Sequence, residues 1–446
     1  MVTEPETPIF SLLEPSGPTR HIELIEGTKS FVACEKYTQG QDWLMNRHGK
    51  QYKTAPWKKA LLIWLGTPPE LKGFSRTNHS LLSWLNGLDN AANKKIKKAL
   101  KKPECMIIFG FDVGDGAAFA AVTVKPSNTK LKSKGKKQAI KASLVDNGQP
   151  KFFEVKRVDH SWLHGRDHDA QSQSLKHKTV VLVGCGSVGG SVAHLLAEAG
   201  VGSIHCIDPG IMEWGNIGRH VLGSDSIGKI KSGRVVRQLQ TRFPHLQFKS
   251  YGTSSWQQVY DANPQVFNNA DLIVSTTGAW AVDAQLNELS LSTKEMPSVL
   301  YGWTEAHAVA GHAVLIPNEK ACLACNFNNT GVHNNQTVDW GKKNTLKREA
   351  ACGTFFQPFG PIELSFINAL IADTALTEML GASKNAICSS WLASRKKVEA
   401  LGGKWSDNWV NKFGDPGEGG FQIQKDWEQN AKCHVCGKVV GDSESG

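Results

Sequence analysis

Short runs of apolar residues separated by amphipathic stretches dominate the middle of the chain. The run Thr179–Val183 is followed by helix-like periodicity over residues 188–199 and by a second apolar run, Ser203–Ile207. Uninterrupted apolar runs of this length are typical of strands buried on both faces, and a helix between two of them is typical of a βαβ unit. The pattern predicts an α/β domain with a mostly parallel sheet.

The same alternation continues towards the carboxyl end. Apolar runs at residues 272–274, 298–301 and 311–316 predict further strands of this sheet, and the strongly apolar stretch 362–380 predicts a long helix. Between them, residues 326–349 are polar, contain glycine and lack periodicity. This composition predicts a loop, which we call the crossing segment because we expect it to cross the face of the nucleotide site that the motifs below predict.

A second set of apolar runs precedes this domain and predicts a smaller α/β domain with a helix around residues 81–98. Its strands are expected at residues 21–24, 31–33, 60–65, 106–111 and 118–124. With 446 residues the chain is too long for one small core. We expect a flexible leader (1–20), an N-terminal α/β domain of unknown role (21–124), a basic linker (125–156), a nucleotide-binding core (157–316) and a C-terminal region (317–446).

Composition narrows the class of protein. Hydrophobic residues make up 40% and charged residues 21% of the sequence, as in soluble globular proteins. No apolar run has the length of a membrane span, and residues 1–18 lack the features of a signal peptide, so we expect a cytoplasmic protein without a membrane partner. Much of the net charge of +10 lies in residues 95–102 and 125–141. The latter run lacks aromatic residues for stacking bases, so an acidic protein partner suits the charge better than a nucleic acid.

A glycine-rich motif directly follows the first strand of the central domain. Gly184, Gly186 and Gly189 have the spacing GxGxxG. Glycines let backbone N–H groups approach a phosphate at the positive end of the next helix, and Asp208, which closes the second strand, can hold ribose hydroxyls. The motif by itself indicates a nucleotide site of unspecified kind, for which an NAD-binding fold is the simplest interpretation.

Polar and charged residues after Asp208 favour a different nucleotide. Asn216, Arg219 and Lys231 follow in order, and Lys231 opens an amphipathic stretch that ends near residue 243. The helix terminus already serves the pyrophosphate of a nicotinamide cofactor, so these donors suit a longer polyphosphate. In such a site fixed cations stabilise the charge that develops as a phosphate is attacked.

In this order of motifs the chain resembles the adenylating superfamily that includes ubiquitin-activating enzymes and the activators of bacterial sulfur-carrier proteins. The resemblance covers about residues 157–380. It implies a Rossmann-like adenylating domain that binds ATP and Mg²⁺. By this resemblance Asn216, Arg219 and Lys231 contact the phosphates together with the glycine loop, Asp208 holds the ribose, and Arg219 and Lys231 assist catalysis.

Two details of the resemblance stay open. The family usually places an aspartate for Mg²⁺ after the fourth strand, where this chain has Thr277, and Asp283 on the following helix is a candidate substitute. The family also places an arginine from the segment before the glycine loop on the triphosphate. Arg157 and Arg166 are both candidates for this role, and a salt bridge in a linker is an equal alternative.

Two pairs of cysteines indicate a metal site. Cys322 and Cys325 form one CxxC pair, and Cys433 and Cys436 form a second, more than a hundred residues later. Each pair supplies half of a tetrahedral thiolate shell, so the four cysteines together predict structural Zn²⁺, with a redox pair as the alternative. Zinc would fasten the C-terminal region to the nucleotide-binding core.

The other cysteines divide into one candidate nucleophile and several structural residues. The resemblance implies a cysteine that receives the activated carboxyl group between the crossing segment and the apolar helix, and Cys352 matches that position. A free cysteine packed under the helix is the alternative. Cys34 and Cys105 lie in apolar surroundings that predict burial, and Cys388 follows the helix without a comparable setting.

Together these features predict an ATP-dependent activating enzyme for a ubiquitin-like protein. The reaction would form an acyl-adenylate and then a thioester on Cys352, for transfer to a conjugating enzyme. The resemblance further implies a homodimer and a role in bacterial defence against phage. Two alternatives stay open: an adenylyltransferase for a sulfur carrier in cofactor biosynthesis and, more distantly, an NAD-dependent dehydrogenase. The dehydrogenase is disfavoured because no clear hydride-site histidine and arginine follow the sheet.

Overall fold

The computed structural model describes two compact units. The first comprises Met1–Gln173 and Gln240–His245, and the second comprises Ser174–Leu239 and Leu246–Gly446. The described residues are 9–14, 20–26, 31–48, 56–65, 105–114, 116–124, 150–317, 321–342, 345–348, 355–358, 360–381, 383 and 385–437, together with positions 68, 81, 84, 85, 94, 95 and 98.

An eight-stranded mixed sheet forms the first unit. In order across the sheet, the strands are β7 (Lys151–Phe153), β6 (Gly116–Val124), β5 (Cys105–Val113), β4 (Trp57–Leu65), β2 (Arg20–Glu26), β3 (Phe31–Cys34), β1 (Ile9–Ser11) and β8 (Val155–Arg157). All five strands predicted for the N-terminal domain are present. The helix predicted at 81–98 and the basic run 125–141 lie largely or wholly outside the described residues.

The first and last strands of this sheet differ from the prediction. β1 lies in the stretch expected to be a flexible leader, and it pairs in parallel with β3 and with β8. Strands β7 and β8 lie at the junction of the expected linker and core. Ile9 and Leu13 are completely buried beside Ile22, and this apolar burial outweighs the preference of the surrounding prolines for irregular structure. The helix α1 (Tyr37–His48) packs on β2 and β3.

The second unit is built on a parallel-rich sheet. In order, its strands are β11 (Gln247–Ser250), β10 (Ser203–Ile207), β9 (Thr179–Val183), β12 (Leu272–Ser275), β13 (Val299–Thr304), β14 (Ala310–Ile316), β18 (Ile387–Ser394) and β20 (Gly419–Asp426). Strands β11 to β13 in this order are parallel, and β14, β18 and β20 extend the sheet in antiparallel fashion. The predicted α/β class with a mostly parallel Rossmann-like sheet is confirmed.

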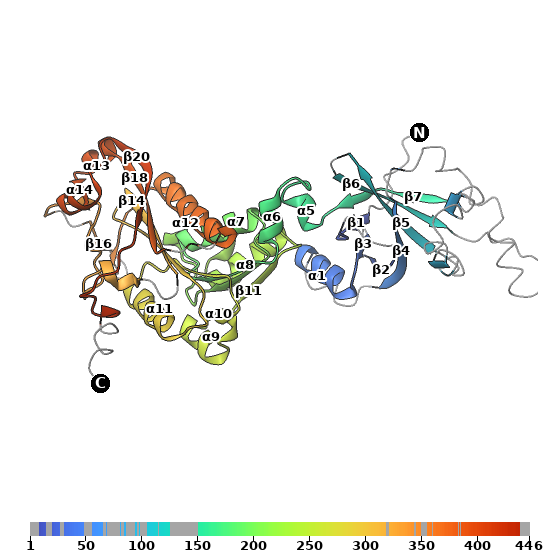
Figure 1. The fold of residues 1–446 in the computed structure, drawn as a ribbon, viewed down its shortest axis with the longest axis horizontal. Coiled ribbons are helices and arrows are strands. Elements are labelled where there is room, and N and C mark those ends of the chain that lie inside the picture. The colour runs from blue at the N-terminus through green and yellow to red at the C-terminus, as the bar shows by residue number, and fades with distance from the viewer. Residues whose placement is uncertain are drawn as a thin grey trace, which may run out of the picture. The chain divides into compact units, whose positions relative to one another are not determined.

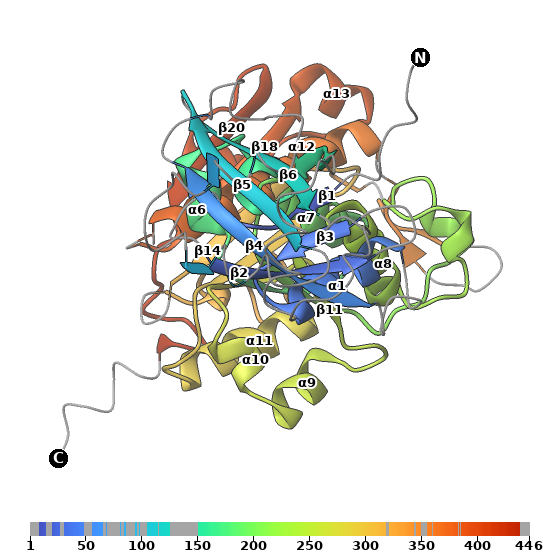
Figure 2. The ribbon, with the colours of Figure 1, turned by 90° about the vertical axis from the view of Figure 1, so that its right-hand side faces the viewer.

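Helices cover both faces of this second sheet. The helices α7 (Ser187–Glu198) and α12 (Pro361–Gly381) lie together on one face, whereas α9 (Trp256–Ala262), α10 (Gln265–Asn268) and α11 (Trp280–Ser292) lie on the other (Figures 1 and 2). This arrangement is that of a doubly wound sheet, in which both faces of the strands are apolar because both are covered. It explains why the strands read as uninterrupted apolar runs.

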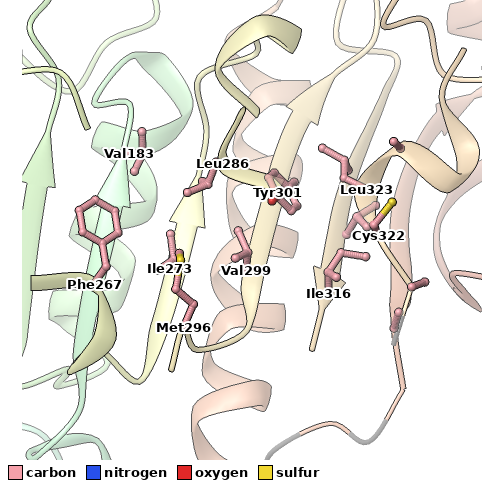
Figure 3. Close-up of a cluster of buried hydrophobic side chains, with 14 of the residues drawn as sticks. Val183, Phe267, Ile273, Leu286, Met296, Val299, Tyr301, Ile316, Cys322 and Leu323 are labelled. Atoms are coloured by element: carbon pink, nitrogen blue, oxygen red, sulfur yellow. The ribbon is translucent and has the colours of Figure 1, made fainter. Parts of the chain in front are cut away.

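The core under α10 and α11 extends to the first cysteine pair. Figure 3 shows Phe267 and Leu286 beside the strand residues Ile273 and Val299, with Cys322 at the far end of the same layer. The predicted boundary between core and C-terminal region at residue 317 therefore falls inside one compact unit. None of the helices in the described part of the chain has both the length and the apolar character needed to cross a membrane.

Candidate nucleotide-binding site

The glycine loop leaves the carboxyl end of β9 in a conformation that requires glycine. Gly184 has φ +89°, and a Cβ on Gly189 would lie 2.0 Å from the carbonyl oxygen of Gly184. A Cβ on Gly186 would meet no atom within 4 Å, so this glycine faces open space. Gly186 is also the N-cap of α7, and no side chain caps the helix there. The first N–H groups of α7 are thus placed to bind a phosphate.

Asp208 fixes the loop from the neighbouring strand. It follows β10, and its two carboxylate oxygens accept hydrogen bonds from Cys185 N and Gly210 N, each at 2.7 Å. A Cβ on Gly210 would lie 2.8 Å from Asp208 Oδ1 and 3.6 Å from Lys231 Nζ, so the carboxylate and the ammonium flank this glycine. Lys231 is the first residue of α8 (Lys231–Arg242), the amphipathic helix that the sequence predicts.

The polar segment after Asp208 brings further donors to the same place. Arg219 Nη1 donates to Gly215 O at 2.9 Å, and Asn216 Oδ1 accepts from Glu213 N at 3.1 Å in a short capping box. The pKa of His220 is lowered chiefly by burial, and the nearby positive charges of Lys231 and Arg219 lower it further. The structure therefore places Arg219 and Lys231 near one partly buried histidine, next to the glycine loop.

His220 is a functional candidate that sequence reasoning missed. Its Nδ1 accepts a hydrogen bond from Leu222 N at 3.1 Å, which leaves the proton on Nε2 to be donated to Cys185 O at 2.8 Å. A neutral imidazole thus binds the glycine loop at Cys185, the same residue whose N–H group donates to Asp208. The available signal was its position directly after Arg219 in the motif.

Thr277 and Asp283, the two residues considered for Mg²⁺, are in contact. Thr277 Oγ1 donates to Asp283 Oδ1 at 2.9 Å, and Ser275 Oγ donates to the same oxygen at 2.5 Å. Burial raises the pKa of Asp283 to about 6, although these two hydrogen bonds oppose the shift. The carboxylate is ionised at neutral pH, so Asp283 offers the negative charge that Thr277 lacks.

A cavity of about 550 Å³ opens beside the glycine loop. The first turn of α7, Thr277 and Asp283 form one side of it. Aromatic rings form much of the remainder: Trp280, Trp303, Phe327, His333 and Trp340. Phe327, His333 and Trp340 belong to the predicted crossing segment, so this part of the chain does line the same cavity as the glycine loop.

The aromatic wall is packed ring against ring. Trp280 and Phe327 stack with centroids 4.7 Å apart, and Phe327 lies 5.5 Å from Trp303 and 5.3 Å from His333. His333 in turn stacks on Trp427. Burial lowers the pKa of His333 to about 3, so its imidazole is neutral and extends an apolar surface.

A buried ion pair supports the crossing segment from behind. Glu305 Oε1 contacts His312 Nε2 at 2.9 Å and accepts from Thr337 N at 2.7 Å, while Oε2 accepts from Val338 N at 3.3 Å. Burial alone would lower the pKa of His312, but its contact with Cys388 and the carboxylate of Glu305 raise it to about 9. Burial would likewise raise the pKa of Glu305, but His312 and Thr337 hold it below its usual range. The pair is therefore charged at neutral pH.

The four CxxC cysteines converge as the sequence predicts. Their Sγ atoms all lie within 4.8 Å of one another, and the closest pairs are separated by 3.4 to 3.8 Å. A tetrahedral Zn²⁺ with Zn–S bonds of about 2.3 Å requires S–S separations of about 3.8 Å, so the cluster could hold zinc. Trp427 Nε1 donates to Cys322 O at 3.0 Å, and Asn430 Nδ2 donates to Cys325 O at 3.3 Å. These hydrogen bonds orient the two cysteine loops.

The structure describes all of the remaining predicted residues except one. Cys352 lies outside the described residues, and its role stays a prediction. Cys34, Cys105 and Cys388 are buried, and burial raises the pKa of Cys34 to about 12, which opposes a nucleophilic thiolate. Arg157 is held by Asp159 and Asp167, and Arg166 is exposed.

The fold and site together define a class of protein. A glycine loop at the start of α7, an acidic residue after β10 and two cations beside them are the features of the ubiquitin-activating-enzyme-like adenylating superfamily. A model of the ThiF family matches residues 164–404, which is more than half of the chain. The chain belongs to the ThiF family.

Relatives of known description fall in the same superfamily. An ATP-dependent ubiquitin transferase-like protein, Cap2 of Escherichia coli (strain TW11681), is 26% identical over 319 residues, which cover 67% of this chain and 53% of the relative. The ubiquitin-like modifier-activating enzyme 5 of Culex quinquefasciatus is 27% identical over 225 residues, covering 47% of this chain and 52% of the relative. The chain thus spans about half the length of the curated relatives that it matches.

Among solved structures, a crystal structure of E. coli MccB with MccA-N7isoASN aligns with 93% of this chain and 94% of its own. The TM-score is 0.41 and the identity is 14%. The family assignment accordingly rests on the sequence match.

Proposed function

We propose that the protein adenylates the carboxyl-terminal carboxylate of a ubiquitin-like protein with ATP. The observation that carries the proposal is the glycine loop with its uncapped helix, flanked by cations on one side and by the cavity on the other. A carboxylate oxygen would attack the α-phosphorus of ATP, and the bond from that phosphorus to the bridging oxygen would break. Pyrophosphate leaves, and an acyl-adenylate remains.

The residues gathered at the loop supply this chemistry. In the proposal, the N–H groups of Gly186 and the first turn of α7 bind phosphate oxygens, and Asp208 accepts from the ribose hydroxyls. Arg219 and Lys231, with the Asn216 amide, stabilise the negative charge that grows on the α-phosphate and on departing pyrophosphate. Asp283 would hold Mg²⁺, which supplies further positive charge to the phosphates.

The proposed second step transfers the acyl group to Cys352. The thiolate would attack the carbonyl carbon of the adenylate, forming a thioester and releasing AMP. The described chain on both sides supports a junction at this point, because β16 (Lys347–Arg348) precedes Cys352, and β17 (Phe355–Phe356) and α12 follow it. A conjugating enzyme would then take the acyl group from the thioester.

The biological setting is also a proposal. The similarity to Cap2, described as an ATP-dependent ubiquitin transferase-like protein, supports a bacterial conjugation system, which we assign to defence against phage in the cytoplasm. We further propose that the enzyme works as a homodimer. Arg157 forms salt bridges with Asp159 and Asp167, which is the alternative role that the sequence analysis left open, and a role for Arg166 at the triphosphate stays a prediction.

A second candidate function, activation of a sulfur carrier, is favoured by one observation. The adenylyltransferase and sulfurtransferase uba4 of Aspergillus niger is 33% identical over 104 residues, or 23% of this chain. Both candidates share the adenylation step. They differ in the fate of the adenylate, which becomes a thioester in one case and a thiocarboxylate in the other.

Removing Cys352 separates the two steps. Cys352→Ala should still exchange pyrophosphate with ATP in the presence of the carrier, because the adenylate forms before a thiol is needed. It should form no reductant-sensitive adduct with the carrier on a denaturing gel, whereas the control Cys388→Ala should form one. An adduct in Cys352→Ala would assign the acceptor to another cysteine. Wild-type enzyme that shows no exchange with any carboxylate would refute adenylation itself.

A further inference from the structure

The order of the strands places the cavity on the acyl side of the glycine loop. Asp208 follows β10, the glycine loop follows β9, and Thr277 and Trp303 belong to the ends of β12 and β13. These four strands are parallel neighbours in the order β10, β9, β12, β13, so their carboxyl ends meet along one edge of the sheet. A ribose on Asp208 therefore lies on one side of the loop, and the cavity lies on the other.

Part of the cavity wall is aromatic, and this part suits an apolar side chain better than a chain of glycines. Stacked rings of Trp280 and Phe327, with Trp303 beside them, present apolar surface. Water occupies about 30 Å³ per molecule in the liquid, so a cavity of about 550 Å³ would hold on the order of ten or more waters against this surface. A tail without side chains would leave much of that water in place. An apolar side chain would displace it, which is favourable in proportion to the area covered.

We propose that this cavity binds the last residues of the substrate protein and selects for a large apolar side chain one or two positions before the terminal carboxylate. The inference rests on the proposed function, because it takes the glycine loop to be the place where the carboxylate meets ATP. The side chain lies among Trp280, Trp303 and Phe327. Selection arises because burial of a leucine-sized side chain favours binding by about tenfold to a hundredfold over glycine.

The test compares the binding of three N-acetylated hexapeptide acids to the full chain by isothermal titration calorimetry. All three end in glycine. One has leucine next to the terminal glycine, one has leucine a position earlier, and one has glycine at both places. We expect at least one leucine peptide to bind tenfold or more tightly than the glycine peptide. Equal binding of all three peptides would overturn the inference.

A variant that fills the cavity tests whether the preference for leucine arises in the cavity. Val332 lines the cavity and is 43% exposed, so Val332→Trp narrows the space without burying a new group in the core. We expect the preference for leucine to fall at least fivefold in this variant. The matched control is Leu291→Trp, at a 41% exposed position of α11 that does not line the cavity, and it should keep the full preference. An unchanged preference in Val332→Trp would also overturn the inference.

Pyrophosphate exchange with the same peptides separates this inference from the proposed function. Selective binding of a leucine peptide without any exchange would refute adenylation and leave the subsite standing. Exchange that proceeds equally with all three peptides would support adenylation and refute the subsite.

Discussion

The two sides of the glycine loop are built on different principles. The nucleotide side consists of backbone N–H groups, Asp208 and two cations, all within one short stretch of sequence. The acyl side consists of aromatic rings from β13, α11 and the crossing segment, with a buried ion pair behind them. The residues of the nucleotide side form one ordered motif between Gly184 and Lys231, which the sequence alone reveals. The rings of the other side, between Trp280 and Trp340, follow no motif, and only the fold brings them together.

The largest expected effect concerns the nucleotide side. Arg219→Ala and Lys231→Ala should each slow carrier-dependent pyrophosphate exchange by about a hundredfold or more, because each removes a fixed cation from a developing charge. The melting temperature should hardly change. Lys229→Ala is the matched control, since Lys229 is exposed and its ammonium donates to the carbonyl of Asp225, away from the glycine loop motif. Wild-type exchange in both variants would remove these residues from the site.

Disrupting the cysteine cluster tests whether peptide binding on the aromatic side can be weakened without an equal loss of ATP binding. Cys433→Ser should release one equivalent of zinc, measured by metal analysis, and lower the melting temperature by about 10 °C, because metal binding contributes to folding. Phe327 and Trp427 adjoin the cluster, so peptide binding should weaken more than ATP binding. His434→Ala, an exposed residue between the same two cysteines, is the control and should keep both the metal and the stability. Retention of zinc by Cys433→Ser would argue against a four-cysteine site.

The Glu305–His312 pair predicts a pH dependence on the acyl side. The pKa of His312 is about 9 in the folded protein, above its ordinary value of 6.5, so its stabilising contribution is complete below about pH 6.5 and is lost as the pH rises through about 9. Glu305→Gln should lower the free energy of unfolding at pH 7 by about 3 kcal/mol, since it leaves a buried histidine without its partner.

Denaturation of both proteins between pH 6 and pH 10 measures this effect. The difference between wild type and Glu305→Gln should shrink above pH 9. Glu418→Gln is the control, because Glu418 is 90% exposed in its ion pair with Arg395 and should have no measurable effect. A difference that stays constant across the range would show that the pair is not charged in the folded protein.

The smallest expected effect concerns Asp283, which lies where the two sides meet. Asp283→Asn keeps the size of the side chain but removes its charge, so the Mg²⁺ concentration required for half-maximal exchange should rise by about tenfold. Asp261→Asn, an exposed aspartate in α9, is the control. An unchanged Mg²⁺ requirement would place the metal on other groups.

The sequence analysis predicted the elements of the nucleotide side well and missed the aromatic cavity on the other side of the glycine loop. β9 and β10 have the predicted bounds, and α7 begins one residue before the prediction, because fully buried strands and a glycine turn impose a strong local pattern. The cavity could not be predicted in this way. Trp280, Trp303 and Phe327 each resemble ordinary core residues, and nothing local records that a crossing segment brings their rings together.

Long-range pairing also explains what was missed in the N-terminal unit. β1 is a three-residue strand whose partners are β3 and, far along the chain, β8. Such a strand gains its stability from neighbours that contribute nothing to the local pattern, so its prolines dominate the prediction. The roles of His220 and His312 were missed for the same reason, because each histidine bonds to a residue outside its own element.

The position of the second cysteine pair has a consequence for the order in which the protein is made. Val181 of β9 shares one hydrophobic core with Trp427 and Cys436. A ribosome adds about 5–20 residues per second, so roughly 10 to 50 seconds separate the synthesis of Val181 from that of Cys436. During this interval the apolar ends of the central strands lack part of their cover. The cysteine cluster, which could hold zinc, can therefore complete this core only after Cys436 has left the exit tunnel.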